Sequence, residues 1–130
     1  PEAARVLADQ GVDILCVPSW TDIRAGFLRV QRCAAARAIE NECYVLLSGS
    51  TGYLAGRDGI DSQYTQSAVF TPADIPFPPD AVLAQADANV EQYLLADLDL
   101  SLLDALRARG AVRNGRDRRR DLLAVTWQGR

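Results

Sequence analysis

The fold of this chain is decided by the stretch Gly26-Phe-Leu-Arg-Val-Gln-Arg-Cys-Ala-Ala-Ala-Arg-Ala-Ile-Glu-Asn41, which leads directly into Cys43-Tyr-Val-Leu-Leu-Ser-Gly49. Its first part predicts a helix over residues 23–41, because apolar or small residues recur at the spacing of one helical face. These residues are Phe27, Val30, Ala34 and Ala38. The continuous apolar run at 43–48 predicts a strand that is buried on both faces.

The residues before this stretch repeat the same order of elements. Residues 2–10 predict a helix that Gly11 ends, since glycine is favoured just past a helix C-terminus. Residues 13–18 are a second apolar run of strand length, and Pro18 closes it. The order helix, strand, helix, strand indicates an α/β fold with parallel neighbouring strands.

Downstream, the pattern predicts a long loop, a further strand, an irregular segment, a strand pair and a short helix. The loop covers residues 49–64, the further strand 66–71 and the irregular segment 72–79. The strand pair is 81–86 with 91–98, and the short helix is 99–109. Four prolines exclude regular structure in the irregular segment. The last residues are first basic and then apolar, and nothing indicates a second domain. We therefore expect residues 1–130 to form a single domain.

Composition predicts a soluble chain. It has 130 residues, of which 48% are hydrophobic and 24% charged, and its net charge is −3. No apolar run approaches the roughly 20 residues of a membrane span, and the first ten residues do not resemble a signal peptide. Three cysteines without close spacing fit a reducing compartment, so we expect a cytoplasmic protein with no membrane and no nucleic-acid partner.

Two absences limit the chemistry of these residues. The chain has no His and no Lys, and all fourteen basic residues are Arg. A Ser-His-Asp triad, a His-ligated zinc site and a lysine Schiff base are therefore excluded within it. Arginine stays protonated and is a poor general base. We expect the chain alone to be inactive.

Three segments are similar to the carbon-nitrogen hydrolase (nitrilase) superfamily. Pro1-Glu2 resembles the dipeptide just beyond that family's nucleophilic cysteine, and Val17-Pro18-Ser19-Trp20 resembles a strand-end motif that lines the substrate pocket. Arg37-Ala38-Ile39-Glu40-Asn41 resembles the family's helix-end motif. Residues 61–72 and 114–121 resemble a branch in which the hydrolase is fused to an N-acetyltransferase domain.

The resemblance implies a four-layer αββα sandwich, of which this chain is the C-terminal portion and an incomplete domain. It implies a Glu-Lys-Cys catalytic set that precedes Pro1, in which the Cys thiolate attacks an amide or nitrile carbon. The Glu is the general base, the Lys stabilises the tetrahedral intermediate, and a thioester acyl-enzyme is hydrolysed. It further implies a small-molecule substrate, no cofactor, and a homo-oligomer through helices 2–10 and 23–41. The Ala-rich face from Ala34 to Ala38 is expected to suit that contact.

The candidate pocket residues are Ser19, Trp20 and Thr21, because α/β sheets place ligands beyond the carboxyl ends of their strands. The alternative is a tryptophan that only packs the loop. The helix-end motif of Arg37, Glu40 and Asn41, like Glu2, is assigned a structural role. Arg37 and Glu40 are spaced for an ion pair at the helix end.

The other candidate functional residues are interpreted as structural or surface residues. Cys16, Cys33 and Cys43 are interpreted as buried structural residues, since free cysteine is among the most buried residue types. The segment Asp58-Gly59-Ile-Asp61 lacks the ligand spacing of a calcium loop, so no metal site is predicted. The arginines at 113, 116 and 118–120 are interrupted by acids and lack interleaved aromatics, which favours a solvated or intersubunit salt-bridge role over nucleic-acid binding.

Two other functions stay open. The chain can be a non-catalytic assembly or interaction module, either a pseudo-hydrolase or a truncated paralogue. A Glu, a Lys and a Cys encoded upstream would favour the enzyme, and their absence would favour the module. An unrelated flavodoxin-like domain is the third alternative, for which the loop at 49–52 is a poor phosphate cradle.

Overall fold

The chain folds around one mixed sheet, which the computed structural model describes within residues 1–129. The sheet has the strand order β1-β2-β5-β6, with β1 and β2 parallel and the other pairs antiparallel. Its strands are β1 (Ile14–Ser19), β2 (Tyr44–Gly49), β5 (Ala68–Phe70) and β6 (Val82–Gln85). The predicted α/β class and the parallel pair are confirmed.

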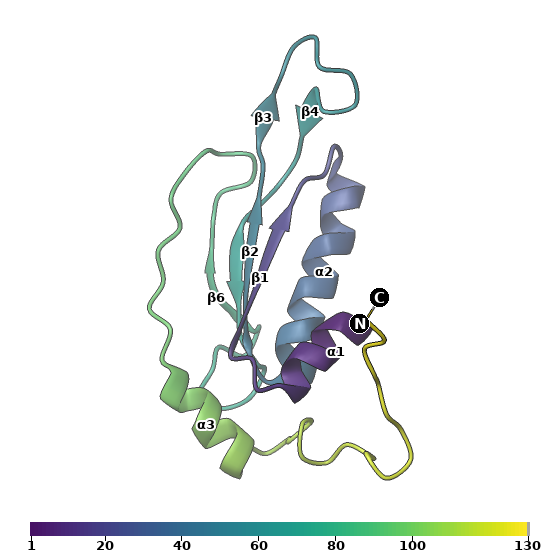
Figure 1. The fold of residues 1–130 in the computed structure, drawn as a ribbon. Helices are drawn as coiled ribbons and strands as arrows, with labels where there is room; N and C mark the ends of the chain where they lie inside the picture. The colour runs from purple at the N-terminus through teal and green to yellow at the C-terminus, as the bar shows by residue number, and fades with distance from the viewer. Residues whose placement is uncertain (130) are drawn as a thin grey trace.

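Two helices lie against one face of this sheet, and a third lies near one end of it (Figure 1). They are α1 (Glu2–Asp9), α2 (Arg24–Asn41) and α3 (Leu100–Arg109). The first two agree with the predicted helices to within one residue at each end. Beyond α2 the chain turns sharply into β2, because Glu42 adopts a left-handed conformation with φ of 51°.

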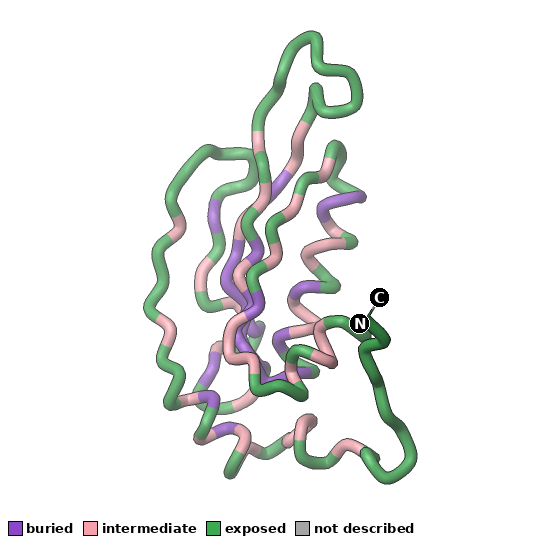
Figure 2. Tube along the Cα trace, in the orientation of Figure 1, coloured by how far each residue is buried: buried purple, intermediate pink, exposed green. Residues whose placement is uncertain are grey.

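The main core lies between α2 and the sheet, as the helical stripe predicts. Phe27, Ala34 and Ala38 are buried there against Val45, Leu47 and Phe70. Figure 2 shows the buried positions gathered along the inner face of α2 and the central strands. Ala34 and Ala38 thus face the chain's own core, so these two positions of the Ala-rich face are largely occupied by contacts within the chain. Their small side chains let α2 approach the sheet closely.

A second, smaller core fixes α3 at the other face of the sheet. Tyr44 points from β2 to that side and packs with Phe77, Leu103 and Leu106. The Tyr44 hydroxyl donates a hydrogen bond of 2.9 Å to the backbone carbonyl of Asp99, whose carboxylate caps the start of α3. Asp99 therefore begins the helix, as its capping chemistry predicts.

Away from α3, the sheet face opposite α1 and α2 has no covering layer among the described residues. In β1, Leu15 is buried beneath the helices, but its neighbour Cys16 points the other way and is exposed. The prediction that Cys16 is buried is therefore wrong, and Cys33 of α2, which was also expected to be buried, is exposed as well. Cys16 is exposed because α3 covers only one end of the sheet, so β1 has a covered face and an uncovered one.

Glu91–Leu98 was expected to be a strand, and it is not. Among the described residues it forms no ladder with β6, and the side chains of Tyr93 and Leu95 are 98% and 88% exposed. An extended segment needs a neighbouring strand to bond its backbone, and no described strand lies beside it. The predicted loop at 49–64 is also more ordered than expected, since β3 (Gly52–Tyr53) pairs with β4 (Ser62–Gln63) at its base.

The open sheet face gives a prediction for these 130 residues by themselves. We expect them to bind a hydrophobic dye such as ANS and to self-associate, because burying a contiguous apolar surface away from water is favourable. Fluorescence titration and light scattering measure the two effects. A monodisperse monomer that does not increase the fluorescence of the dye would contradict the expected exposure of this sheet face.

Candidate functional site

The predicted pocket residues follow the carboxyl end of β1, beside the end of β2. Ser19 lies opposite Gly49 in the parallel register, and Trp20 is half exposed just beyond it. The Thr21 hydroxyl donates a 2.7 Å hydrogen bond to the Tyr64 carbonyl, so it is already used in holding the loop. These three residues therefore share the expected sheet edge, but none of them lines the polar cavity found there.

A small polar cavity of about 130 Å³ lies at this same edge, on the side of β5 and β6. Its hydroxyl residues are Ser48 at the end of β2, Thr51 after β2, and Thr65 and Ser67 before β5; none of them is among the residues predicted from the sequence. The Oγ1 atoms of Thr51 and Thr65 are buried without a hydrogen-bond partner among the described residues. Buried hydroxyls are normally hydrogen-bonded, so these two are available to a ligand or water.

Gly49 allows the two sides of this edge to meet. A Cβ atom at this position would lie 2.0 Å from Thr65 Oγ1 and 3.0 Å from Ser19 Oγ. The backbone N–H of Gly49 donates to Ser67 Oγ at 3.2 Å. The absence of a side chain here therefore brings Ser19, Thr65 and Ser67 around one backbone position.

The helix-end motif forms the polar contacts that its spacing predicts. Arg37 Nη2 lies 3.1 Å from Glu40 Oε1, and the Asn41 amide donates to the Arg37 carbonyl at 2.9 Å. These contacts tie the last turn of α2 to itself before the chain enters β2. Glu2 lies in the first turn of α1 and is largely exposed.

The arginine cluster forms ion pairs within the chain. Arg118 and Arg120 both contact Asp9 of α1, the second at 3.5 Å, and Arg119 pairs with Asp121. The segment from 115 to 121 is thereby fixed against α1. A salt-bridge role is observed for three of the five arginines, and it is intramolecular.

The three cysteines differ in reactivity because they differ in burial. Cys43 is fully buried, and this burial raises the pKa of its thiol to about 11, whereas Cys16 and Cys33 are exposed. The thiolate is the reactive form, so Cys43 stays protonated and unreactive at neutral pH. We expect a chromogenic disulfide reagent to titrate two thiols in the native 130-residue chain and three in denaturant. Three rapid reactions in the native state would contradict this assignment.

Within the described residues, the site supplies hydroxyls, backbone groups and an aromatic ring. Such groups bind and orient a ligand, and the carboxylates of Asp87 and Glu91 line the same cavity, but the sequence offers neither an imidazole base nor a lysine electrophile. No helix in the described part of the chain is long and apolar enough to cross a bilayer.

Comparison with known proteins gives concordant results. The model of the carbon-nitrogen hydrolase family matches residues 1–108. A probable hydrolase of Bacillus subtilis, YhcX, is 40% identical over 128 residues, which cover 98% of this chain and 25% of that protein. The crystal structure of the Caenorhabditis elegans NitFhit protein superposes with a TM-score of 0.76 at 30% identity, over 96% of this chain and 27% of that one.

A shorter match comes from a deaminated glutathione amidase of Synechocystis, 44% identical over 52 residues, or 40% of this chain and 19% of the amidase. The chain thus spans a quarter or less of the length of these curated relatives. The solved relative shares the arrangement described above, so the α/β sheet with its helical layer is part of the nitrilase-type αββα fold. Because the family model covers most of the sequence, the chain belongs to the carbon-nitrogen hydrolase family.

Proposed function

We propose that this chain builds one wall of the substrate pocket in an amidase-like carbon-nitrogen hydrolase that acts on non-peptide C–N bonds. The observation that carries the proposal is the sheet edge where Ser19, Gly49 and Thr65 converge, with two buried hydroxyls lacking partners nearby. An edge formed by strand ends is where α/β folds bind ligands.

The reacting groups in this proposal come from outside these 130 residues. The chain contains no lysine at all, and its buried Cys43 has a raised pKa and no neighbouring histidine. A Cys nucleophile, a Glu base and a Lys that stabilises the tetrahedral intermediate must therefore be supplied by another part of the protein. Ser19, Trp20 and the Thr65 hydroxyl would shape the space in which an amide or nitrile is held.

An amide is the substrate class that we favour over a nitrile. The Synechocystis relative is named as an amidase, and it is 44% identical to this chain over the 52 matched residues. Hydroxyl side chains suit an amide, which offers both a carbonyl acceptor and an N–H donor, better than a nitrile, which only accepts.

We also propose that the protein is a cytoplasmic homo-oligomer that uses the outer surface of α1 and α2. An apolar groove of about 480 Å³ lies there between α1, β1 and α2. Ala3, Val30 and Cys33 line it, and an apolar groove of this size favours burial against another surface. Ala34 also lines this groove, whereas Ala38 is fully buried in the core.

Trp20 gives the direct test of the pocket wall. In the protein that carries this chain and its catalytic residues, we expect Trp20→Ala to lower kcat/KM for an amide roughly 10-fold or more, since a buried aromatic contact with substrate is worth over a kcal/mol. Trp127→Ala is the matched control, because Trp127 is 75% exposed and far along the chain from the strand ends. Equal kinetics for the two variants would remove Trp20 from the pocket.

The reaction class is tested by ammonia release across a panel of amides and nitriles. The upstream coding sequence is read first for a Glu, a Lys and a Cys. If these are present and replacing that Cys by Ala abolishes ammonia release, the hydrolase is supported. If they are absent and the whole panel is inert, the chain is better assigned as a non-catalytic assembly module.

A further inference from the structure

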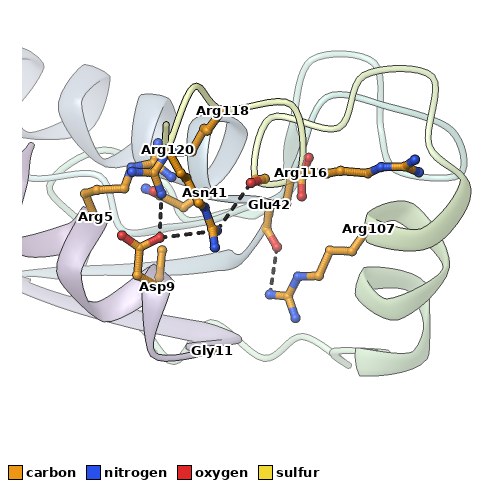
Figure 3. A pocket seen from close by; sticks show the side chains of 11 residues that line it. Arg5, Asp9, Gly11, Asn41, Glu42, Arg107, Arg116, Arg118 and Arg120 are labelled. Carbon is orange, nitrogen blue, oxygen red and sulfur yellow. Dashed lines mark hydrogen bonds and ion pairs between the residues drawn. The ribbon is translucent and has the colours of Figure 1, made fainter. Parts of the chain in front are cut away.

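A second cavity lies at the opposite end of the sheet, where β1 and β2 begin. Its volume is about 380 Å³, and it is enclosed by the end of α1, the end of α2, Arg107 of α3 and the segment from 115 to 120. Figure 3 shows its side chains, among which Arg5, Arg118, Arg120 and Asp9 cluster closely while Arg116 extends away from them. The hydrolase pocket proposed above lies at the other ends of the same strands and does not use these residues.

The cavity carries an excess of positive charge in a chain that is acidic overall. Five arginines line it, against the two carboxylates of Asp9 and Glu42. Asp9 is shared by two arginines, and Arg107 pairs with Asp13 at 2.6 Å. Among the described residues Arg5 contacts only a backbone carbonyl, that of Glu40 at 3.4 Å. The positive charge is therefore not balanced by the protein itself.

Arg5 is affected by its partial burial and by the neighbouring positive charge. Burial, and then the neighbouring Arg118 charge, lower the pKa of its guanidinium below the usual value. Guanidinium groups gathered around a partly closed cavity form charge-assisted, bidentate contacts with carboxylate or phosphate oxygens. An anion bound here would relieve the repulsion between Arg5 and Arg118.

Two buried acceptors distinguish this cavity from a simple anion hole. The side chains of Asn41 and Glu42 line it and are only 7% and 4% exposed. Asn41 Oδ1 and Glu42 Oε1 have no hydrogen-bond partner among the described residues. A buried acceptor without a hydrogen-bond partner destabilises the fold, so these two atoms are expected to have one. The missing partner must donate a hydrogen bond, which a fully deprotonated anion cannot do.

We propose that this cavity binds hydrogen phosphate. Its charged oxygens accept hydrogen bonds from Arg5, Arg118 and Arg120, and its P–OH group donates to Glu42 Oε1 or Asn41 Oδ1. Sulfate has the same shape and charge but no proton at neutral pH, so the buried carboxylate repels it. Phosphodiesters also lack this proton, which disfavours nucleic acid. A phosphate monoester has a second pKa near 6 and mostly lacks the proton at pH 7, so free phosphate is favoured over an ester.

The test is calorimetric titration of the whole protein that carries this chain, at pH 7 and constant ionic strength set with chloride. We expect sodium phosphate to bind at least 10-fold more tightly than sodium sulfate, with glycerol phosphate between them. Arg118→Gln should weaken phosphate binding at least 10-fold. The matched control Arg57→Gln, in an exposed loop outside the cavity, should leave it unchanged.

Glu42→Gln tests the selectivity itself. The glutamine amide can donate to an unprotonated oxygen, so we expect this variant to bind sulfate more tightly and to lose the preference for phosphate. A purely structural role for Glu42 would weaken both anions alike.

Several outcomes would overturn the proposal. They are equal binding of phosphate and sulfate, a phosphate affinity unchanged in the arginine variant, and tight binding of a labelled oligonucleotide that depends on the same arginines. Circular dichroism checks that the variants are folded. If Arg118→Gln unfolds because it loses the pair with Asp9, Arg5→Gln is used instead, since Arg5 makes only one long backbone contact. Ammonia release is not a readout here, so failure of this site leaves the proposed hydrolase activity unaffected.

Discussion

Replacing Gly49 by alanine is expected to destabilise the protein by about 1–3 kcal/mol, the usual cost of forcing extra volume into a packed site. The new Cβ would lie 2.0 Å from Thr65 Oγ1 and 2.7 Å from Thr65 Cβ. The hydroxyl can rotate away, but the Cβ cannot, so the backbone of β2 or of the segment before β5 must move. Denaturant unfolding followed by circular dichroism measures the loss.

The same substitution is expected to reduce hydrolase activity of the protein that carries the chain. Gly49 lies between Ser19 and Thr65 at the proposed pocket wall, and displacement of about 1 Å can cost up to about 100-fold in rate. The double variant Gly49→Ala with Thr65→Gly should recover stability, because it removes the atoms that clash. Gly129→Ala is the control, since its Cβ would meet only ordinary contacts at 3.5 Å. A stable, fully active Gly49→Ala protein would contradict the close approach.

The helix over 24–41 and the strands beside it could be predicted because their signal is local. The positions of Phe27, Ala34 and Ala38 repeat with helical periodicity, and the structure buries all three. The strand at 44–49 follows from an unbroken apolar run. Sequence pattern determines which side of such an element turns inward, so this part of the fold needed no information from distant residues.

Cys16 and the segment 91–98 were mispredicted for a different physical reason. A strand signal states that a segment suits a sheet, but the pairing partner and the covering layer lie elsewhere in the molecule. Within the described residues Cys16 has no layer above it, and 91–98 has no strand beside it. Their apolar character indicates that a fuller assembly covers them, which the dye-binding prediction tests.

The candidate site was predicted only in part, because half of it comes from an antiparallel strand. Ser19 follows from its place at the end of β1. Thr65 and Ser67 precede β5, and they reach the same edge only because β5 runs antiparallel to β2, with Leu47 paired to Ala68. Nothing in the local sequence gives that register. The buried hydroxyls became visible only once the strands were placed.

The largest loss of stability is expected for Phe27→Ala, at about 3–5 kcal/mol. The Phe27 side chain is 2% exposed, it anchors α2 on the sheet, and its ring lies 5.6 Å from that of Tyr64. Removing it leaves a cavity under the first turn of α2 and also frees the segment before β5. Urea unfolding by circular dichroism and by tryptophan fluorescence should show the same lowered midpoint.

Ile23→Ala is the matched control, because Ile23 immediately precedes α2 but is 58% exposed and should change stability by about 0.5 kcal/mol or less. A comparable loss in both variants would mean that α2 is held by its general helical character rather than by the buried stripe. The packing of Phe27 also bears on function, because its ring lies against that of Tyr64. The Tyr64 carbonyl in turn accepts a hydrogen bond from Thr21, beside the proposed pocket. If the stripe holds α2, then Phe27→Ala should also lower kcat/KM under conditions where the protein stays folded, and Ile23→Ala should not.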